Sequence, residues 1–194
     1  MIQRLVALLA LSLWPAALWA QTPEALDKGE IFVKLEDVKG HDVPRLRVTA
    51  VIDAPPAKVF EIMTDCDKFT KRLPRVDEAR TLKKSKTSHE CEVTIGLPFP
   101  LSDLTSITVD RRKFGPDEWK RTWSLKKGVE QESYRKNDGG VILTPFENDP
   151  NRTLFVYYVH AIPKTAVPDF LRTPAQKKSL PGLVERVRKE VKKL

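Results

Sequence analysis

The stretch Leu180–Leu194, LPGLVERVRKEVKKL, decides how the rest of the chain is interpreted. Apolar residues recur along it at intervals of three and four: Leu180, Leu183, Val184, Val187, Val191 and Leu194. That spacing places one apolar stripe along an α-helix. We predict a single long helix over Ala166–Leu194, which bends or restarts after Ser179 because Pro181 lacks an amide hydrogen. Such a helix needs an apolar surface to cover.

The chain before this helix supplies a candidate surface, because short runs alternate apolar with polar residues. The predicted strands are Glu30–Asp37, Arg45–Asp53, Arg75–Lys84, His89–Ile95, Thr105–Arg112, Glu118–Lys127, Gly140–Phe146 and Thr153–Ile162. Glycine, proline and asparagine separate them, and we expect turns at Asp138-Gly139-Gly140 and at Asn148-Asp149-Pro150-Asn151. Two helices are predicted after the second strand, over Ala57–Cys66 and Lys68–Leu73. The expected fold is α+β, with a curved antiparallel sheet wrapped around the long C-terminal helix.

The first twenty residues have the features of a secretory signal peptide. Arg4 is followed by the apolar run Leu5–Leu13, and a stretch of small residues ends at Ala20. We expect cleavage there, which leaves 21–194 as one domain exported to the periplasm or secreted; an uncleaved membrane anchor is the alternative. The net charge of +8 favours anionic partners. For an exported protein these are membrane headgroups rather than nucleic acid.

The chain has two cysteines, Cys66 and Cys91. Export to an oxidising compartment would allow them to form a disulfide. However, Cys91 alternates with Val93 and Ile95 along a predicted strand, so our expectation is that it is a small buried core residue without a covalent partner.

Several stretches resemble START lipid-transfer domains and the wider Bet v 1-like (SRPBCC) superfamily. They are Arg47–Pro56 (RVTAVIDAPP), Val59–Asp65 (VFEIMTD), Gly96–Asp103 (GLPFPLSD) and Ala161–Val187. The resemblance spans nearly the whole chain after the leader, and the order of elements agrees. It departs at Leu104-Thr105-Ser106, where the family commonly has Arg-Asp-Tyr or Arg-Asp-Phe. The resemblance implies a helix-grip fold and an internal cavity for a hydrophobic ligand.

Inward-facing side chains on the strands and the closing helix either fill the core or line this cavity, and the resemblance favours a cavity. The predicted ligand-binding residues are Val93, Ile95, Phe99, Leu101, Ile107, Trp119, Arg121, Trp123, Phe155, Tyr157, Phe170, Leu183 and Val187. Arg121 shares a strand face with two of the tryptophans and is expected to point inward. A buried guanidinium requires a partner, which is either a ligand carboxylate or phosphate or an internal acidic residue.

The segment Gly96–Asp103 is a candidate gating loop beside the terminal helix. Its Phe99 either dips into a bilayer or packs under the helix as core. The polar face of the terminal helix carries many lysines and arginines, which predict transient contact with an anionic membrane surface.

No catalytic residue, metal ligand or cofactor site is predicted. The three histidines, His41, His89 and His160, form no recognised catalytic or metal-binding pattern, and His160 is expected to point outward. The first hypothesis is therefore a carrier of a hydrophobic small molecule or lipid. The alternatives are a cyclase or dehydratase that uses the same cavity, and a protein with a filled core. The oligomeric state stays open.

Overall fold

The computed structural model describes residues 22–99, 101–165 and 169–194, with side chains described for all of these except 169–178. The predicted signal peptide lies outside the described residues. The elements are α1 (Pro23–Asp27), β1 (Phe32–Val38), β2 (His41–Ile52), α2 (Pro56–Thr64), the 3-10 helix η1 (Cys66–Lys68), α3 (Phe69–Arg72), β3 (Val76–Lys84), β4 (His89–Ile95), β5 (Leu104–Lys113), β6 (Trp119–Leu125), β7 (Tyr134–Phe146), β8 (Asp149–Pro163) and α4 (Asp169–Val191). None of the described helices is both long enough and apolar enough to cross a bilayer.

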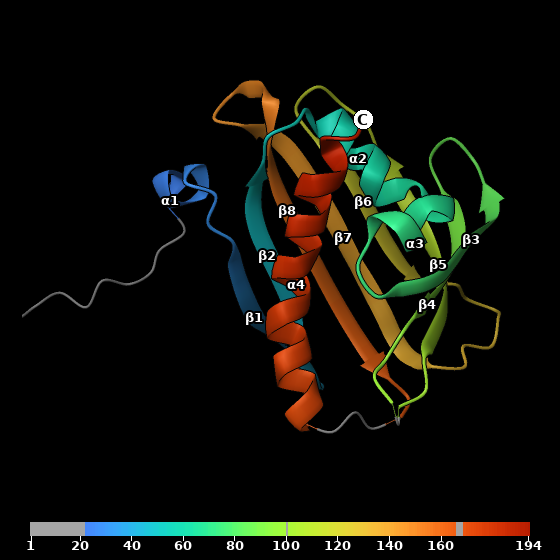
Figure 1. Cartoon of the computed structure of the whole chain (residues 1–194). Coiled ribbons are helices and arrows are strands. Elements are labelled where there is room, and N and C mark those ends of the chain that lie inside the picture. The colour runs from blue at the N-terminus through green and yellow to red at the C-terminus, as the bar shows by residue number, and fades with distance from the viewer. Residues whose placement is uncertain (1–21, 100, 166–168) are drawn as a thin grey trace, which may run out of the picture.

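The strands form one antiparallel sheet in the order β1-β2-β8-β7-β6-β5-β4-β3. Pairing of β2 with β8 joins the first hairpin to the last strand, which leaves β1 and β3 as the two edges. Figure 1 shows the sheet curving around α4, which crosses its concave face, while α2 and α3 cover the space beside it. The α+β helix-grip architecture expected from the sequence is confirmed.

The core lies between the concave face of the sheet and the helices. From α4 come Val184 and Val187, both fully buried, as the apolar stripe predicts. From α2 come Val59 and Ile62, and Phe155 contributes from the middle of β8. Burying a side chain of this size stabilises a fold by about 1.5–3 kcal/mol. Packing against the sheet therefore fixes both helices in place.

Helix α4 runs without a break through Pro181, so of the two predicted alternatives, a bend or a restart, the restart is wrong. The flanking residues Leu180 and Leu183 are buried in the core, and this packing holds the helix together across the missing hydrogen bond. Arg188 adds an anchor, because its guanidinium donates hydrogen bonds to the carbonyls of Val51 and Gly29 at 3.0 Å.

The turn predicted at Asp138-Gly139-Gly140 is also wrong, because these residues lie inside β7. A side chain at Gly139 would clash with the indole of Trp123 and would lie 2.5 Å from the carbonyl oxygen of Tyr158. These glycines therefore permit close packing across the sheet rather than a chain reversal. The other predicted turn, Asn148-Asp149-Pro150-Asn151, begins one residue earlier than expected and is shorter, because β8 starts at Asp149. It falls at Glu147 and Asn148, which have φ angles of 49° and 65°.

The cysteines form a disulfide, which corrects the expectation of an unbonded Cys91. Residue alternation does place Cys91 inward, but η1 packs over β3 and β4 and brings the Cα of Cys66 within 6.3 Å. That separation is in the usual range for a disulfide. The bond ties η1 to the sheet directly beside α3.

Candidate functional site

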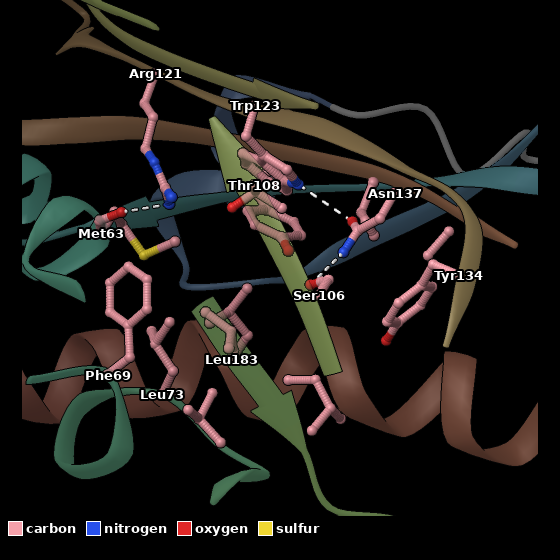
Figure 2. Close-up of a pocket in the computed structure, with 16 residues that line it drawn as sticks. Met63, Phe69, Leu73, Ser106, Thr108, Arg121, Trp123, Tyr134, Asn137 and Leu183 are labelled. Atoms are coloured by element: carbon pink, nitrogen blue, oxygen red, sulfur yellow. Dashed lines mark hydrogen bonds between the residues drawn. The ribbon is translucent and has the colours of Figure 1, made fainter. Parts of the chain in front are cut away.

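A pocket of about 190 Å³ lies between the concave face of the sheet and the helices α3 and α4. Its lining residues are Met63, Phe69, Leu73, Val76, Val93, Ile95, Ser106, Thr108, Arg121, Trp123, Tyr134, Asn137, Tyr157, Val159, Ala161 and Leu183. Figure 2 shows Phe69, Leu73 and Leu183 on the helical side. Residues from β5, β6 and β7 form the opposite wall, which is more polar.

Strand alternation explains which side chains reach the pocket. Arg121 and Trp123 are two residues apart on β6, and Ser106 and Thr108 are two apart on β5, so each pair shares a face. On β7, Tyr134 and Asn137 are three residues apart and still both line the pocket. A shift in the β7–β8 register falls between Tyr134 and Lys136, and such a bulge changes the side toward which a side chain points.

Arg121 points inward as predicted, and its partner is an internal acidic residue. Its Nε donates to Oδ2 of Asp110 at 2.8 Å, and its Nη1 donates to the carbonyl of Met63 at 2.9 Å. Arg112 also donates to Asp110, at 2.9 Å, and the backbone amide of His89 does so at 2.7 Å. The hydrogen bonds donated by the two arginines and the backbone amide thus compensate the cost of burying this carboxylate.

Electrostatics within this cluster follow from burial and charge pairing. Burial alone would raise the pKa of Asp110, but Arg121 and then Arg112 hold the pKa of that carboxyl below its ordinary value. Burial lowers the pKa of Arg121, and Asp110 opposes that shift. Asp110 and Arg121 are therefore both ionised, and their contacts join the end of α2 to β5 and β6.

The second polar group in the pocket is a chain of side-chain hydrogen bonds. Trp123 Nε1 donates to Oδ1 of Asn137 at 3.2 Å, and Nδ2 of Asn137 donates to Oγ of Ser106 at 3.2 Å. Burial raises the pKa of Tyr134 and of Tyr157 to about 12, so both hydroxyls stay protonated at neutral pH.

The predicted site residues lie in different environments, some in the pocket and others in the packed core. Those that line the pocket are Val93, Ile95, Arg121, Trp123, Tyr157 and Leu183. Those in or against the packed core are Trp119, Phe155 and Val187. Trp119 contacts the rings of Phe60 and Phe114 rather than the pocket.

The remaining predicted residues lie apart from the pocket or outside the description. Ile107 lies between Ser106 and Thr108 on β5 and so faces the other side of the sheet. Phe99 is 95% exposed, which rules out the alternative that its ring packs under the terminal helix as core. Leu101 is half-buried in the same loop. The side chain of Phe170 lies outside the described residues.

Sequence reasoning missed Ser106, Thr108, Tyr134 and Asn137. On β5 the apolar residues were assigned to the interior, although they face the other side. Asp110 shares a face with Ser106 and Thr108, and pairing it with the inward Arg121 would have revealed the correct face. The sequence predicts β7 only from Gly140 onward, whereas the strand begins at Tyr134. Alternation therefore could not indicate the direction of Tyr134 or Asn137.

Other polar groups lie elsewhere. His160 faces away from the pocket as expected, yet it is fully buried, with Nε2 2.9 Å from the carbonyl of Val43 and its ring against His41. Burial lowers the pKa of His160. Among the residues that the structure describes, no three histidine, cysteine or acidic side chains gather as metal ligands.

Solved structures show what this chain is similar to. No protein-family model and no curated protein sequence matches it. The STAR-related lipid transfer protein of Xanthomonas axonopodis is 18% identical, with a TM-score of 0.73 over 84% of this chain and 93% of that one. Human StAR-related lipid transfer protein 5 is 11% identical, with a TM-score of 0.70 over 88% and 95%. The Zhui aromatase/cyclase from Streptomyces sp. R1128 is 15% identical, with a TM-score of 0.56 over 76% and 93%. The chain therefore has a START-like fold.

Proposed function

We propose that this protein is an exported carrier that binds one hydrophobic molecule, of the lipid, sterol or quinone class, and transfers it at a membrane. The observation that carries this proposal is the pocket between sheet and helices, whose lining is mainly aliphatic and aromatic. Its place in a fold shared with lipid transfer proteins of bacterial and human origin supports the same function.

Two features support export. The first is the leader-like sequence of residues 1–20. The second is the Cys66–Cys91 disulfide, because such bonds persist in oxidising compartments such as the periplasm or the extracellular space.

Membrane contact is supported chiefly by Phe99, whose exposed ring sits in the loop between β4 and β5. An exposed aromatic ring on a loop is suited to the boundary between headgroups and acyl chains. The basic face of α4 contributes less than its sequence suggests. Arg186 and Arg188 donate hydrogen bonds to backbone carbonyls of the body, whereas Lys189 and Lys192 are exposed and free to contact an anionic surface.

A cyclase or dehydratase is the second candidate, because an aromatase/cyclase has a similar fold. General acid–base chemistry works best with groups whose pKa lies near the working pH. Among the described lining residues, Tyr134 and Tyr157 have pKa values of about 12, and Arg121 is already paired with Asp110. This set of groups is better suited to holding a ligand than to moving protons.

The test is native mass spectrometry of the protein purified from the periplasm of an expressing bacterium, followed by organic extraction. Val159→Phe puts a benzyl side chain into the pocket in place of a smaller isopropyl group, and Val156→Phe makes the same change on the opposite face of β8. We expect a stoichiometric apolar molecule with the wild type and the Val156 variant, and its loss from the folded Val159 variant. Wild-type protein that is empty and takes up no fluorescent lipid would overturn the proposal.

A further inference from the structure

The two ends of the pocket differ in how their polar groups are satisfied. Figure 2 shows Arg121 at one end and Ser106, Asn137 and Tyr134 at the other, with Trp123 between them. At the first end, the guanidinium is held by Asp110 and by a backbone carbonyl. We call the second end the polar corner, defined as Ser106, Tyr134 and Asn137.

Hydrogen bonding in the polar corner is incomplete. Asn137 accepts a hydrogen bond from the indole of Trp123 and donates one to the hydroxyl oxygen of Ser106. The hydroxyl proton of Ser106 has no acceptor in the described part of the chain. The hydroxyl of Tyr134 also has no partner there, although its side chain is only 6% exposed and faces the pocket. Hydroxyl groups that face a pocket without a protein acceptor are free to donate to a ligand, so the corner is suited to an oxygen from elsewhere.

The backbone around the corner is fixed independently of any ligand. Ser133, the neighbour of Tyr134, accepts a hydrogen bond from the amide of Thr105 on β5 at 2.9 Å. Its carbonyl accepts a second from the amide of Lys164 at 2.8 Å. These bonds hold the start of β7 against β5, beside Ser106. A binding group supported in this way keeps its geometry without a ligand.

Charge decides which oxygen fits. Among the described residues that line the pocket, Arg121 alone carries a charge, and it lies at the far end. A carboxylate or phosphate in the corner would be buried without a cation, which is costly, whereas a neutral oxygen needs only hydrogen-bond donors. The raised pKa of Tyr134, about 12, keeps its hydroxyl a donor throughout the physiological range.

We propose that the polar corner binds a neutral acceptor oxygen of the ligand, such as a ketone, quinone or ester carbonyl, so that the polar end of the ligand points away from Arg121. This inference rests on the proposed carrier function and narrows its ligand class. It disfavours free fatty acids and phospholipids bound with their charged groups inside, and it assigns Arg121 to holding the pocket wall.

Three probes on one bicyclic frame test the proposal. They are 2-acetylnaphthalene with a carbonyl, 2-ethylnaphthalene with two hydrogens in place of the carbonyl oxygen, and 2-naphthoate with an anion. The frame is chosen to fill the pocket, whose volume of about 190 Å³ exceeds that of an apolar cavity of about 150 Å³ that holds a single benzene ring. Binding is measured by calorimetry on the disulfide-bonded protein. The variants are Tyr134→Phe and Ser106→Ala, with Tyr158→Phe on the outer face of β8 as matched control.

We expect wild-type protein to bind 2-acetylnaphthalene about tenfold more tightly than 2-ethylnaphthalene and no less tightly than 2-naphthoate. Each corner variant should weaken binding of the ketone about three- to tenfold and leave binding of the hydrocarbon unchanged, while the Tyr158 control should change neither affinity. Tightest binding of 2-naphthoate, or corner variants that leave the ketone unaffected, would overturn the proposal while the carrier function stands. Failure of all three probes to bind would overturn both.

Discussion

Reduction of the Cys66–Cys91 disulfide gives a stability change that can be worked out from the structure. The two cysteines are 25 residues apart and enclose η1, α3 and β3. Closing a loop of that length in the unfolded chain removes about 12 cal/mol/K of entropy, so the bond stabilises the fold by about 3.5 kcal/mol at 25 °C. The enclosed segment carries Phe69 and Leu73, which form the helical wall of the pocket.

The measurement is urea unfolding of the same protein with and without a phosphine reductant, followed by tryptophan fluorescence. With a urea slope of about 2 kcal/mol/M, the midpoint should fall by roughly 1.7 M on reduction. Both sulfurs are almost completely buried, so reduction must be completed in the unfolded state before refolding. The double variant Cys66→Ala/Cys91→Ala is the control, because the reductant should not change its midpoint.

Two results would refute this reasoning. One is a difference of less than about 1 kcal/mol between the oxidised and reduced forms, which would mean that chain entropy does not dominate. The other is alkylation of both cysteines in unfolded, unreduced protein, which would show that the bond is not formed.

Three further predictions concern single residues. Asp110→Asn should lower the free energy of unfolding by about 3 kcal/mol or more, because Arg121 stays buried without its counter-charge; since the folded pKa of Asp110 is lowered, its contribution in the wild type is lost as the pH falls through that pKa. Gly139→Ala should lower the free energy of unfolding by about 1–3 kcal/mol through overpacking. Gly182→Ala, where a new Cβ meets no neighbour, should raise it by up to about 1 kcal/mol. Urea midpoints compare the two variants, and equal effects would contradict the packing account. The pKa of His160 is lowered by burial, so the unfolded state takes up its proton first and stability should fall as the pH drops below 6.5; NMR titration of the ring should give a pKa below 6.5, and an unshifted pKa would count against this reading.

Much of the fold was predictable, because strand alternation and helix spacing are local signals. The apolar stripe from Leu180 to Val191 located the closing helix, and β4 was predicted with its observed bounds. The errors occurred where one residue type serves two purposes. Gly139 and Gly140 have the composition of a turn, yet they lie within a strand because Trp123 and Tyr158 pack closely over them. Nothing in the local sequence distinguishes these uses.

The site was less predictable than the fold. Alternation predicted the inward direction of Arg121, Trp123 and Tyr157, and the family resemblance favoured a cavity there. Tyr134 and Asn137 were missed because a bulge and an early start of β7 determine where they point, and both depend on pairing with β8. Similarly, the disulfide depends on how η1 packs against β4, which is a tertiary contact that residue spacing does not encode.

The most direct test of the account is methyl NMR of the protein during titration with 2-ethylnaphthalene. A ligand in the pocket should shift the methyl signals of Val93, Ile95 and Leu183, which line it, and leave Val156 on the outer face unchanged. The account predicts saturable shifts confined to the pocket methyls. Shifts confined to exposed methyls, or no shifts at a saturating probe concentration, would contradict the claim that this cavity binds apolar molecules.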